Sequence, residues 1–264
     1  MTQVLPLSLQ TEVAARPRNL LAVASGKGGV GKTWLAITLA HALARSGRRI
    51  LLFDGDLGLA NVDIQLGLMP SQDLGTVLAG RLTLAQAAAP YEAGGFDIVA
   101  GRSGCGRLAA LSSARLGGLA DQLAAIALRY DDVILDIGAG VDQTVRQLCS
   151  HAGICIVVTT DEPTALTDAY AFMKLAQLEG SPAEMQIVIN MASSLRSGEK
   201  TYAALHRACS SFLKLSPPLL GIVRRDPKVR EAIRHQTALL TRYPTCEAAS
   251  DVEAIAMALA ALPA

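Results

Sequence analysis

The hydrophobic positions of this chain fall into short runs that alternate with longer segments of mixed polarity. Most of the short runs are apolar at nearly every position, which is typical of strands covered by helices on both faces. We expect strands over Leu20–Ala24, Arg49–Asp54, Phe96–Ala100, Val133–Asp136, Ile154–Thr159, Gln186–Asn190 and Leu219–Val223. The longer segments have helical length and composition, and we expect helices over Lys32–Ser46, Leu108–Arg129, Thr164–Leu178, Glu199–Leu213 and Asp226–His235.

Strand and helix alternate along the chain, which predicts right-handed βαβ crossovers and an α/β fold. We therefore expect one mostly parallel sheet of about seven or eight strands with helices on both faces. Residues 1–18 mix Pro, Thr, Gln and Arg without periodicity and are expected to form a tail or short leading segment. No linker, repeat or low-complexity tract divides residues 19–264, so this range is predicted to be a single domain.

Composition narrows the classes of function. Of the 264 residues, 51% are hydrophobic and 18% are charged, which allows a sizeable core. The formal net charge of +1 argues against a nucleic-acid binder, whose phosphate contacts need clustered Lys and Arg. No stretch has the ~18 consecutive apolar residues of a membrane span, and no basic residue precedes the N-terminal apolar run, as a signal peptide would require. The five Cys show no CxxC pairing, which favours buried thiols in a reducing cytoplasm.

The most informative segment joins the first predicted strand to the first predicted helix. Gly26, Gly31, Lys32 and Thr33 satisfy the P-loop pattern G-x-x-x-x-G-K-[ST] in the strand–loop–helix context that it requires. Glycines let successive backbone N–H groups point at phosphate oxygens, and the following helix adds the positive end of its dipole. We expect Lys32 to reach the β- and γ-phosphates of ATP and the Thr33 hydroxyl to bind Mg²⁺. The residues predicted to contact the nucleotide here are Gly26, Lys27, Gly28, Gly29, Val30, Gly31, Lys32, Thr33 and Trp34.

Carboxylates end two other predicted strands. Asp54 and Asp56 follow an apolar run at positions i and i+2, so they point to the same side of an extended chain. Asp136 ends a second apolar strand and is followed by Gly138 and Gly140. This is the Walker B arrangement, in which the acid holds Mg²⁺ through water. The glycines after Asp136 would let a backbone N–H approach the γ-phosphate.

A second lysine, Lys27, directly follows the first glycine of the loop, at a position where the ordinary P-loop pattern accepts any residue. The stretch K-G-G-V-G-K-T is similar to the deviant Walker A motif of the MinD/ParA class of ATPases, and Asp54-Gly-Asp56 resembles the D-x-D element of that class. The resemblance implies that Lys27 reaches across an ATP-dependent homodimer to the partner's nucleotide. A phosphate contact in cis and a solvated loop charge are the alternatives for Lys27. The resemblance also implies that Asp56 lies by the γ-phosphate and positions the attacking water or the metal shell, with Asp54 in support.

On this interpretation Lys27, Lys32 and Asp56 act in catalysis, and Thr33, Asp56 and Asp136 hold the metal. For the base, the resemblance implies that Asn190, at the end of the sixth predicted strand, presents its amide to adenine; a strand-end cap is the alternative. Arg224 and Asp226 lie in the loop where relatives close over the base. Trp34 replaces a small or polar residue of the class, and it packs either on the purine or on a neighbouring helix.

Three longer segments narrow the class further. Residues 56–63 resemble the D-L-G-L-A-N-x-D of FlhG proteins, residues 159–170 their T-T-P-E-P-T-A-x-T-D-A-Y, and residues 101–108 their G-G-S-G-x-x-x-L. The resemblance covers about residues 20–240. It implies a cytoplasmic regulator of flagellar number or placement. Such a protein can also associate peripherally with the inner membrane or the cell pole. Its partners would be an FlhF-type GTPase, C-ring components or a flagellar transcription activator.

Both ends of the chain depart from the FlhG pattern, as does Asp161, which replaces a proline. The N-terminal tail lacks the D-Q-A-type segment through which relatives stimulate the GTPase FlhF. Residues 247–264 carry apolar side chains at helical spacing but no Lys or Arg, unlike the basic helix with which MinD and many FlhG proteins dock on lipid. We expect a terminal helix packed on the domain, and weak or absent membrane binding.

Two other functions stay open from the sequence. A ParA-like ATPase that partitions DNA or cargo needs a basic surface, and one dense basic run exists, made of Arg224, Arg225, Lys228, Arg230 and Arg234. A metabolic or redox P-loop enzyme is the other alternative. Cys105 stands where the nitrogenase iron protein has one cluster ligand, but residues 137–148 contain no second Cys. An iron–sulfur cluster is therefore discounted.

Overall fold

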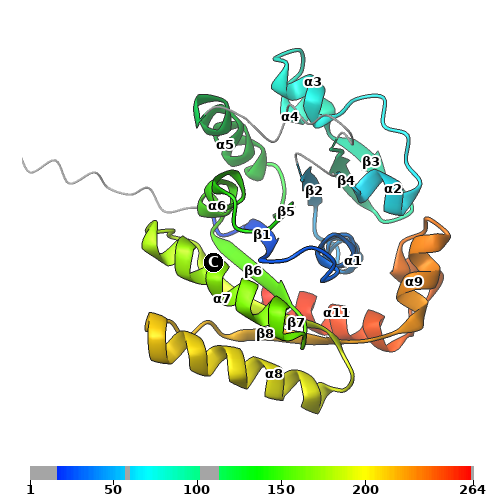
Figure 1. Ribbon diagram of the computed structural model, residues 1–264. Helices are drawn as coiled ribbons and strands as arrows, with labels where there is room; N and C mark the ends of the chain where they lie inside the picture. The colour runs from blue at the N-terminus through cyan, green and yellow to red at the C-terminus, as the bar shows by residue number, and fades with distance from the viewer. Residues whose placement is uncertain (1–16, 57–59, 102–112, 263–264) are drawn as a thin grey trace, which may run out of the picture.

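The computed structural model of the chain describes residues 17–56, 60–101 and 113–262. Its centre is an eight-stranded sheet in the order β3-β4-β2-β5-β1-β6-β7-β8 (Figure 1). The strands are β1 (Leu20–Ser25), β2 (Ile50–Gly55), β3 (Ala89–Tyr91), β4 (Phe96–Val99), β5 (Asp132–Ala139), β6 (Ile154–Thr159), β7 (Glu184–Ala192) and β8 (Leu219–Arg224). Neighbouring strands pair in parallel except β3, which runs antiparallel to β4. The predicted mostly parallel α/β sheet is confirmed.

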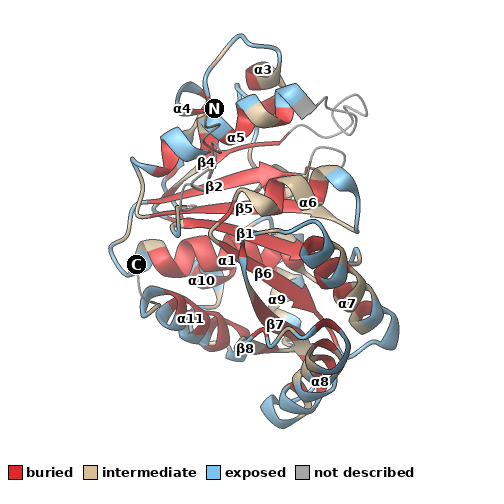
Figure 2. Cartoon of the chain, turned by 90° about the vertical axis from the view of Figure 1, so that its left-hand side faces the viewer, coloured by how far each residue is buried: buried red, intermediate tan, exposed pale blue. Residues whose placement is uncertain are grey.

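Helices cover both faces of the sheet, with outer surfaces exposed and strands buried (Figure 2). They are α1 (Lys32–Arg45), α2 (Val62–Leu66), α3 (Leu74–Leu78), α4 (Leu84–Ala87), α5 (Ser113–Ala127), α6 (Gln143–Ser150), α7 (Pro163–Leu178), α8 (Leu195–Ala208), α9 (Pro227–Arg234), α10 (Leu239–Arg242) and α11 (Glu247–Ala260). A π-helical turn, Cys209–Leu213, extends α8. Alternate residues of each strand enter opposite layers: Leu21 and Val23 pack with α1 and α11, whereas Leu20 and Ala22 pack with α5, α6 and α7.

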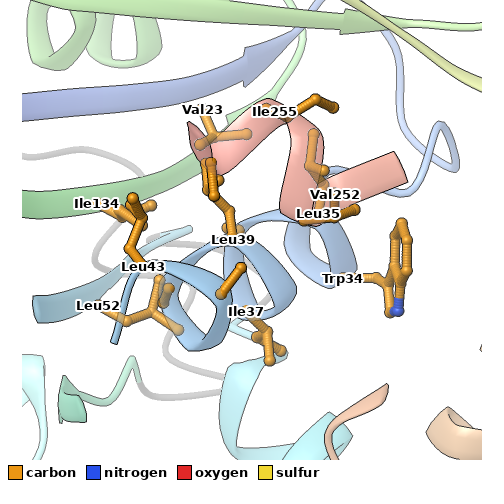
Figure 3. Close-up of a cluster of buried hydrophobic side chains, with 14 of the residues drawn as sticks. Val23, Trp34, Leu35, Ile37, Leu39, Leu43, Leu52, Ile134, Val252 and Ile255 are labelled. Carbon is orange, nitrogen blue, oxygen red and sulfur yellow. The ribbon is translucent and has the colours of Figure 1, made fainter. Parts of the chain in front are cut away.

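The first helix lies in the middle of one layer. Leu35 and Leu39 of α1 are fully buried, and Val252 and Ile255 of α11 cover them (Figure 3). Apolar residues at i and i+3 on α11 form the stripe that a packed helix needs. The predicted terminal helix on the domain is therefore confirmed. Within the described part of the chain, no helix combines the length and apolarity needed to cross a membrane.

Short elements were harder to predict than long ones. The strand β3 and the helices α2, α3, α4, α6 and α10 were not predicted, and all are eight residues or shorter. The helix predicted over Leu108–Arg129 appears as α5, and its first residues fall outside the described range. Residues 1–16 of the predicted tail, Cys105 and residues 102–104 of the G-R-S-G segment also fall outside it. Of the cysteines described, Cys149, Cys155 and Cys209 are buried and free, as predicted.

The strand order brings the predicted site residues together. The carboxyl ends of β2, β5 and β1 lie side by side, and Asp54 of β2 pairs with Asp136 of β5 in register. The P-loop leaves the end of β1, the next strand along. Ligands of open α/β sheets bind at this carboxyl edge.

Candidate nucleotide-binding site

The loop between β1 and α1 is held in shape by its glycines. Gly29 and Gly31 both have φ of +83°, a left-handed conformation that side chains rarely adopt. Gly26 lies directly against α7, because a Cβ there would be 2.1 Å from the carbonyl oxygen of Asp168. The Ser25 hydroxyl donates to the carbonyl of Lys27 at 2.9 Å. The loop is thus fixed at both ends and supported from below by α7.

Lys32 and Asp136 form a buried ion pair beneath the loop. Lys32 Nζ donates to Asp136 Oδ1 at 2.5 Å, and the two side chains are 6% and 1% exposed. Burial raises the pKa of Asp136, and the Lys32 ammonium and the Thr33 hydroxyl act against that rise. The pair keeps a positive charge at the start of α1, where phosphates would meet the helix N-terminus.

The surroundings of Asp136 fit a magnesium ion. Its second oxygen, Oδ2, is buried and has no hydrogen-bond partner in the described structure. Asp56 lies close by, since a Cβ on Gly138 of β5 would be 3.6 Å from Asp56 Oδ1, and the Asp56 charge raises the pKa of Asp136. No group of three or more His, Cys, Asp or Glu is placed to hold a metal among the residues described. Mg²⁺ typically uses one or two carboxylates with waters and phosphates, so Thr33, Asp56 and Asp136 suffice.

Asp54 organises the segment that follows β2. Its Oδ1 accepts the N–H of Asp56 at 3.3 Å, and its Oδ2 accepts the N–H groups of Asn61 and Val62, both at 3.1 Å. The carboxyl group is fully buried, and burial together with the charge of Asp136 raises the pKa of Asp54 to about 7. Asp54 therefore holds the backbone of Asp56 and of Asn61 and Val62 at the edge of the sheet, and its supporting role in the site stays a prediction.

Lys27 lies at the rim of the site and does not contact Asp136. Its Nζ donates to Thr164 Oγ1 at 2.8 Å and to Glu162 Oε2 at 3.0 Å, at the N-terminus of α7. The Lys27 side chain is 37% exposed, and that of Glu162 is 63% exposed. A cation is disfavoured near the positive end of a helix, and the Glu162 carboxylate offsets this by pairing with the Lys27 ammonium. This contact was not predicted, because nothing in the local sequence links residues 135 positions apart.

A cavity of about 590 Å³ opens above the P-loop. Its wall includes every loop residue from Lys27 to Trp34 and also Asn190, Arg224 and Asp226. The Asn190 side chain is buried; its Nδ2 donates to the carbonyl of Val30 at 2.8 Å, and its Oδ1 accepts the N–H of Met191. Asn190 therefore braces the P-loop, and its predicted contact with a base stays a prediction.

Two predicted base-binding residues have structural partners. Arg224 makes a two-pronged ion pair with Asp251 of α11 and a further contact with Glu247 at 2.5 Å. Asp226 caps α9 by accepting the N–H of Lys228 at 2.8 Å. These bonds fix the loop after β8 to the terminal helix. Whether either residue also contacts a nucleotide stays a prediction.

Trp34 is 6% exposed, belongs to the buried cluster that includes α1 and α11, and also lines the cavity. Its ring points away from Leu39 and Leu43 of the same helix (Figure 3). The indole packs among buried residues, as one of the two sequence-based interpretations requires, and contact with a purine stays a prediction. Its Nε1 is buried without a hydrogen-bond partner in the described structure.

A glycine loop between a buried strand and a helix, with its lysine on the carboxylate of a neighbouring strand, defines a P-loop nucleotide-binding protein. Residues 21–239 match the family model of the CobQ/CobB/MinD/ParA nucleotide binding domain. The chain belongs to this MinD/ParA family of nucleotide-binding ATPases.

Two relatives align with most of the chain by sequence. The chain is 36% identical over 247 residues to the antiactivator FleN of Pseudomonas aeruginosa, covering 94% of this chain and 88% of the relative. It is 29% identical over 238 residues to the flagellum site-determining protein YlxH of Helicobacter pylori, covering 89% and 80%. The resemblance to FlhG-type proteins is confirmed by these relatives.

Solved structures share the fold. The cell division ATPase MinD of Pyrococcus furiosus superposes with a TM-score of 0.78 at 22% identity, covering 94% of this chain and all of that chain. The septum site-determining protein MinD of Pyrococcus horikoshii, complexed with Mg-ADP, gives a TM-score of 0.74 at 23% identity, covering 90% and 93%. At these identities the likeness establishes the fold alone.

Proposed function

We propose that this chain binds ATP with Mg²⁺ above the carboxyl ends of β1, β2 and β5, forms a homodimer in the ATP state, and hydrolyses ATP slowly. One observation carries the proposal. The two lysines of the P-loop lie in different surroundings, Lys32 buried on Asp136 and Lys27 exposed at the rim. This difference supports the assignment of Lys32 to the chain's own nucleotide and of Lys27 to the nucleotide of a second protomer.

Each residue has a role in this proposal. Lys32 and the loop N–H groups hold the β- and γ-phosphates. Thr33, Asp56 and Asp136 hold Mg²⁺, which when bound neutralises charge on the phosphate oxygens. Asp56 orients the attacking water, and Asp54 fixes the backbone of Asp56. Lys27 of one protomer approaches the γ-phosphate in the other, so loss of that phosphate weakens the dimer.

The switch would act on protein partners that regulate flagellar number or placement. Support comes from relatives named as an antiactivator and as a flagellum site-determining protein, which align over most of the chain. Candidate partners are a flagellar transcription activator, C-ring components and an FlhF-type GTPase. We infer a cytoplasmic protein that is recruited to the cell pole or inner membrane by such partners.

Partition of DNA is the weaker alternative on grounds of charge. Within the basic run, Arg224 is neutralised by Asp251 and Glu247, and Lys228 is paired with Glu231. That leaves Arg225, Arg230 and Arg234 outside the ion pairs of the described structure. Three arginines supply few phosphate contacts, so ATP-dependent DNA binding with a steep salt dependence would be needed to favour this function.

The switch is tested by mass measurement in solution with ATP and Mg²⁺. Lys27→Ala should bind ATP as a monomer, and Asp56→Ala should bind ATP and persist as a dimer. If both variants are monomeric in ATP and hydrolyse it at the wild-type rate, the switch model is wrong. The flagellar role is tested by counting flagella in a deletion strain complemented with wild type or Lys27→Ala. Normal counts in the deletion strain would contradict it.

A further inference from the structure

Two residues that line the nucleotide cavity each carry a buried polar atom with no hydrogen-bond partner among the described residues. One atom is the indole Nε1 of Trp34, in the first turn of α1, and the other is the amide oxygen Oε1 of Gln65, on α2. Both residues line the same cavity. A buried polar atom that makes no hydrogen bond is unfavourable, and native proteins contain few of them. A donor and an acceptor left unpaired in one wall therefore indicate a missing ligand group.

The wall that carries these atoms is well fixed. The N–H of Val62, at the start of α2, donates to Asp54, and the carbonyl of Ile64 accepts Gln236 Nε2 at 3.1 Å. The short helix α2 is thus held to the sheet at one end and to the segment after α9 at the other. Trp34 is 6% exposed and belongs to the buried layer that also includes α9 and α11. These contacts hold the backbone of α2 in place, while the half-buried Gln65 side chain keeps its rotational freedom.

The chemistry selects the ligand group. A phosphate oxygen only accepts, so it would satisfy the indole N–H and leave the Gln65 oxygen unpaired. An amino group only donates and would leave the indole unpaired. A hydroxyl both donates and accepts, so it satisfies both atoms. In a nucleoside triphosphate the hydroxyls belong to the sugar, and Trp34 follows Lys32 by two residues, close to where the phosphates would end.

We propose that Trp34 and Gln65 form a subsite for the ribose hydroxyls of the bound nucleotide, an inference that rests on the proposed ATP binding. Trp34 Nε1–H donates to a ribose oxygen, and the same hydroxyl donates to Gln65 Oε1. Both atoms are closed to water in the present conformation. The half-buried Gln65 side chain turns aside to admit the sugar. Val229 and Ile233 of α9, which line the same cavity, face the apolar side of the ring.

The test compares ATP with its 2′-deoxy and 3′-deoxy analogues by titration calorimetry in Mg²⁺. One neutral hydrogen bond corresponds to roughly 2- to 10-fold in affinity, so wild type should prefer ATP over at least one analogue by that factor. Trp34→Phe keeps the ring and removes the N–H, and Gln65→Met keeps the length and removes the amide. Each variant should bind ATP more weakly and bind the deoxy analogue with unchanged affinity, so the preference for ATP over the analogue is lost. Gln72→Met, at an exposed position outside the cavity, is the control and should keep it.

The two hypotheses fail in different ways. If wild type does not bind ATP, the proposed function is wrong. If wild type binds ATP but shows no preference, or both variants keep the wild-type preference, the ribose subsite is wrong while ATP binding stands. A different result would place the indole on the base and overturn the inference. In that case Trp34→Leu would lose selectivity for purine nucleotides, while Trp34→Phe and Gln65→Met would keep the preference for ATP over its deoxy analogues.

Discussion

The contact of Lys27 with Glu162 and Thr164 predicts that the free protomer restrains its own dimerisation. If Lys27 has to cross the interface to reach the partner's γ-phosphate, the ion pair with Glu162 must break first. Glu162→Gln removes the carboxylate and keeps the shape of the side chain. It also leaves the ammonium beside the positive end of α7, which favours its departure. We therefore expect Glu162→Gln to form a tighter ATP-dependent dimer.

The magnitude follows from exposure. An ion pair whose side chains are 37% and 63% exposed contributes roughly 0.2–1 kcal/mol. A dimer breaks two such pairs, so the variant gains about 0.4–2 kcal/mol, or roughly 2- to 30-fold in the dimer dissociation constant. Salt should reduce the difference, because at about 1 M ionic strength the screening length is only ~3 Å.

Sedimentation or mass photometry in saturating ATP and Mg²⁺ measures this constant. Asp161→Asn is the matched control, because it removes the same charge at the position next to Glu162. The Asp161 side chain is exposed and makes no bond to Lys27 in the described structure. A dimer of Glu162→Gln that is unchanged or weaker than wild type would refute the reasoning. A weaker dimer would mean that Glu162 holds Lys27 ready for the partner.

Three further predictions concern the packing beneath the site. Gly26→Ala should lower the free energy of unfolding by roughly 1–3 kcal/mol or more, because the added Cβ would lie 2.1 Å from the Asp168 backbone. Gly28→Ala is the control and should not lower it, since a Cβ there has nothing within 4 Å. Equal melting temperatures of the two variants would contradict the prediction. Lys32→Met should lower the free energy of unfolding, measured with denaturant, by about 3–5 kcal/mol, because it leaves the Asp136 carboxylate buried and unpaired. Adding Asp136→Asn should restore most of that stability. A double variant as unstable as Lys32→Met alone would be evidence against the ion pair. Burial and the charge of Arg45 lower the pKa of His41 from 6.5 to about 4, so the folded state binds fewer protons than the unfolded chain and stability falls as pH drops from 6.5 towards 4. His41→Leu should remove up to about 2 kcal/mol of that loss between pH 7 and pH 5, a figure reduced by any solvent contact of the ring, and an unchanged pH dependence would contradict the assignment.

The long elements of the sheet could be predicted because each is buried on both faces. Strand β6 was predicted with its observed bounds, Ile154–Thr159. Strand β3 could not be, since Ala89-Pro-Tyr91 has neither length nor alternation, and its proline is tolerated only because the strand lies at the edge. Helix α6 was missed although Val145, Leu148 and Cys149 are buried at helical spacing. That signal was readable but short.

Prediction of the site was best where the motif itself fixes the geometry. The loop pattern and the strand-end acids were enough to predict that Lys32 and Asp136 lie at one site, because parallel strands place their carboxyl ends at one edge of the sheet. The ion pair between them was not predicted. The partners of Lys27 could not be predicted, since α7 approaches this lysine only through tertiary packing. Arg224 shows the same limit: its bonds to Asp251 depend on where α11 docks.

Helix α7 touches the P-loop twice, through Asp168 beneath Gly26 and through Glu162 and Thr164 beside Lys27. One helix therefore contacts both the base of the loop and the exposed lysine at its rim. Any partner whose affinity for α7 changes with the nucleotide state must change nucleotide affinity by the same factor, because coupling between two binding sites is reciprocal. A protein that binds the outer face of α7 in one nucleotide state only would thus change the affinity for the nucleotide without contacting it.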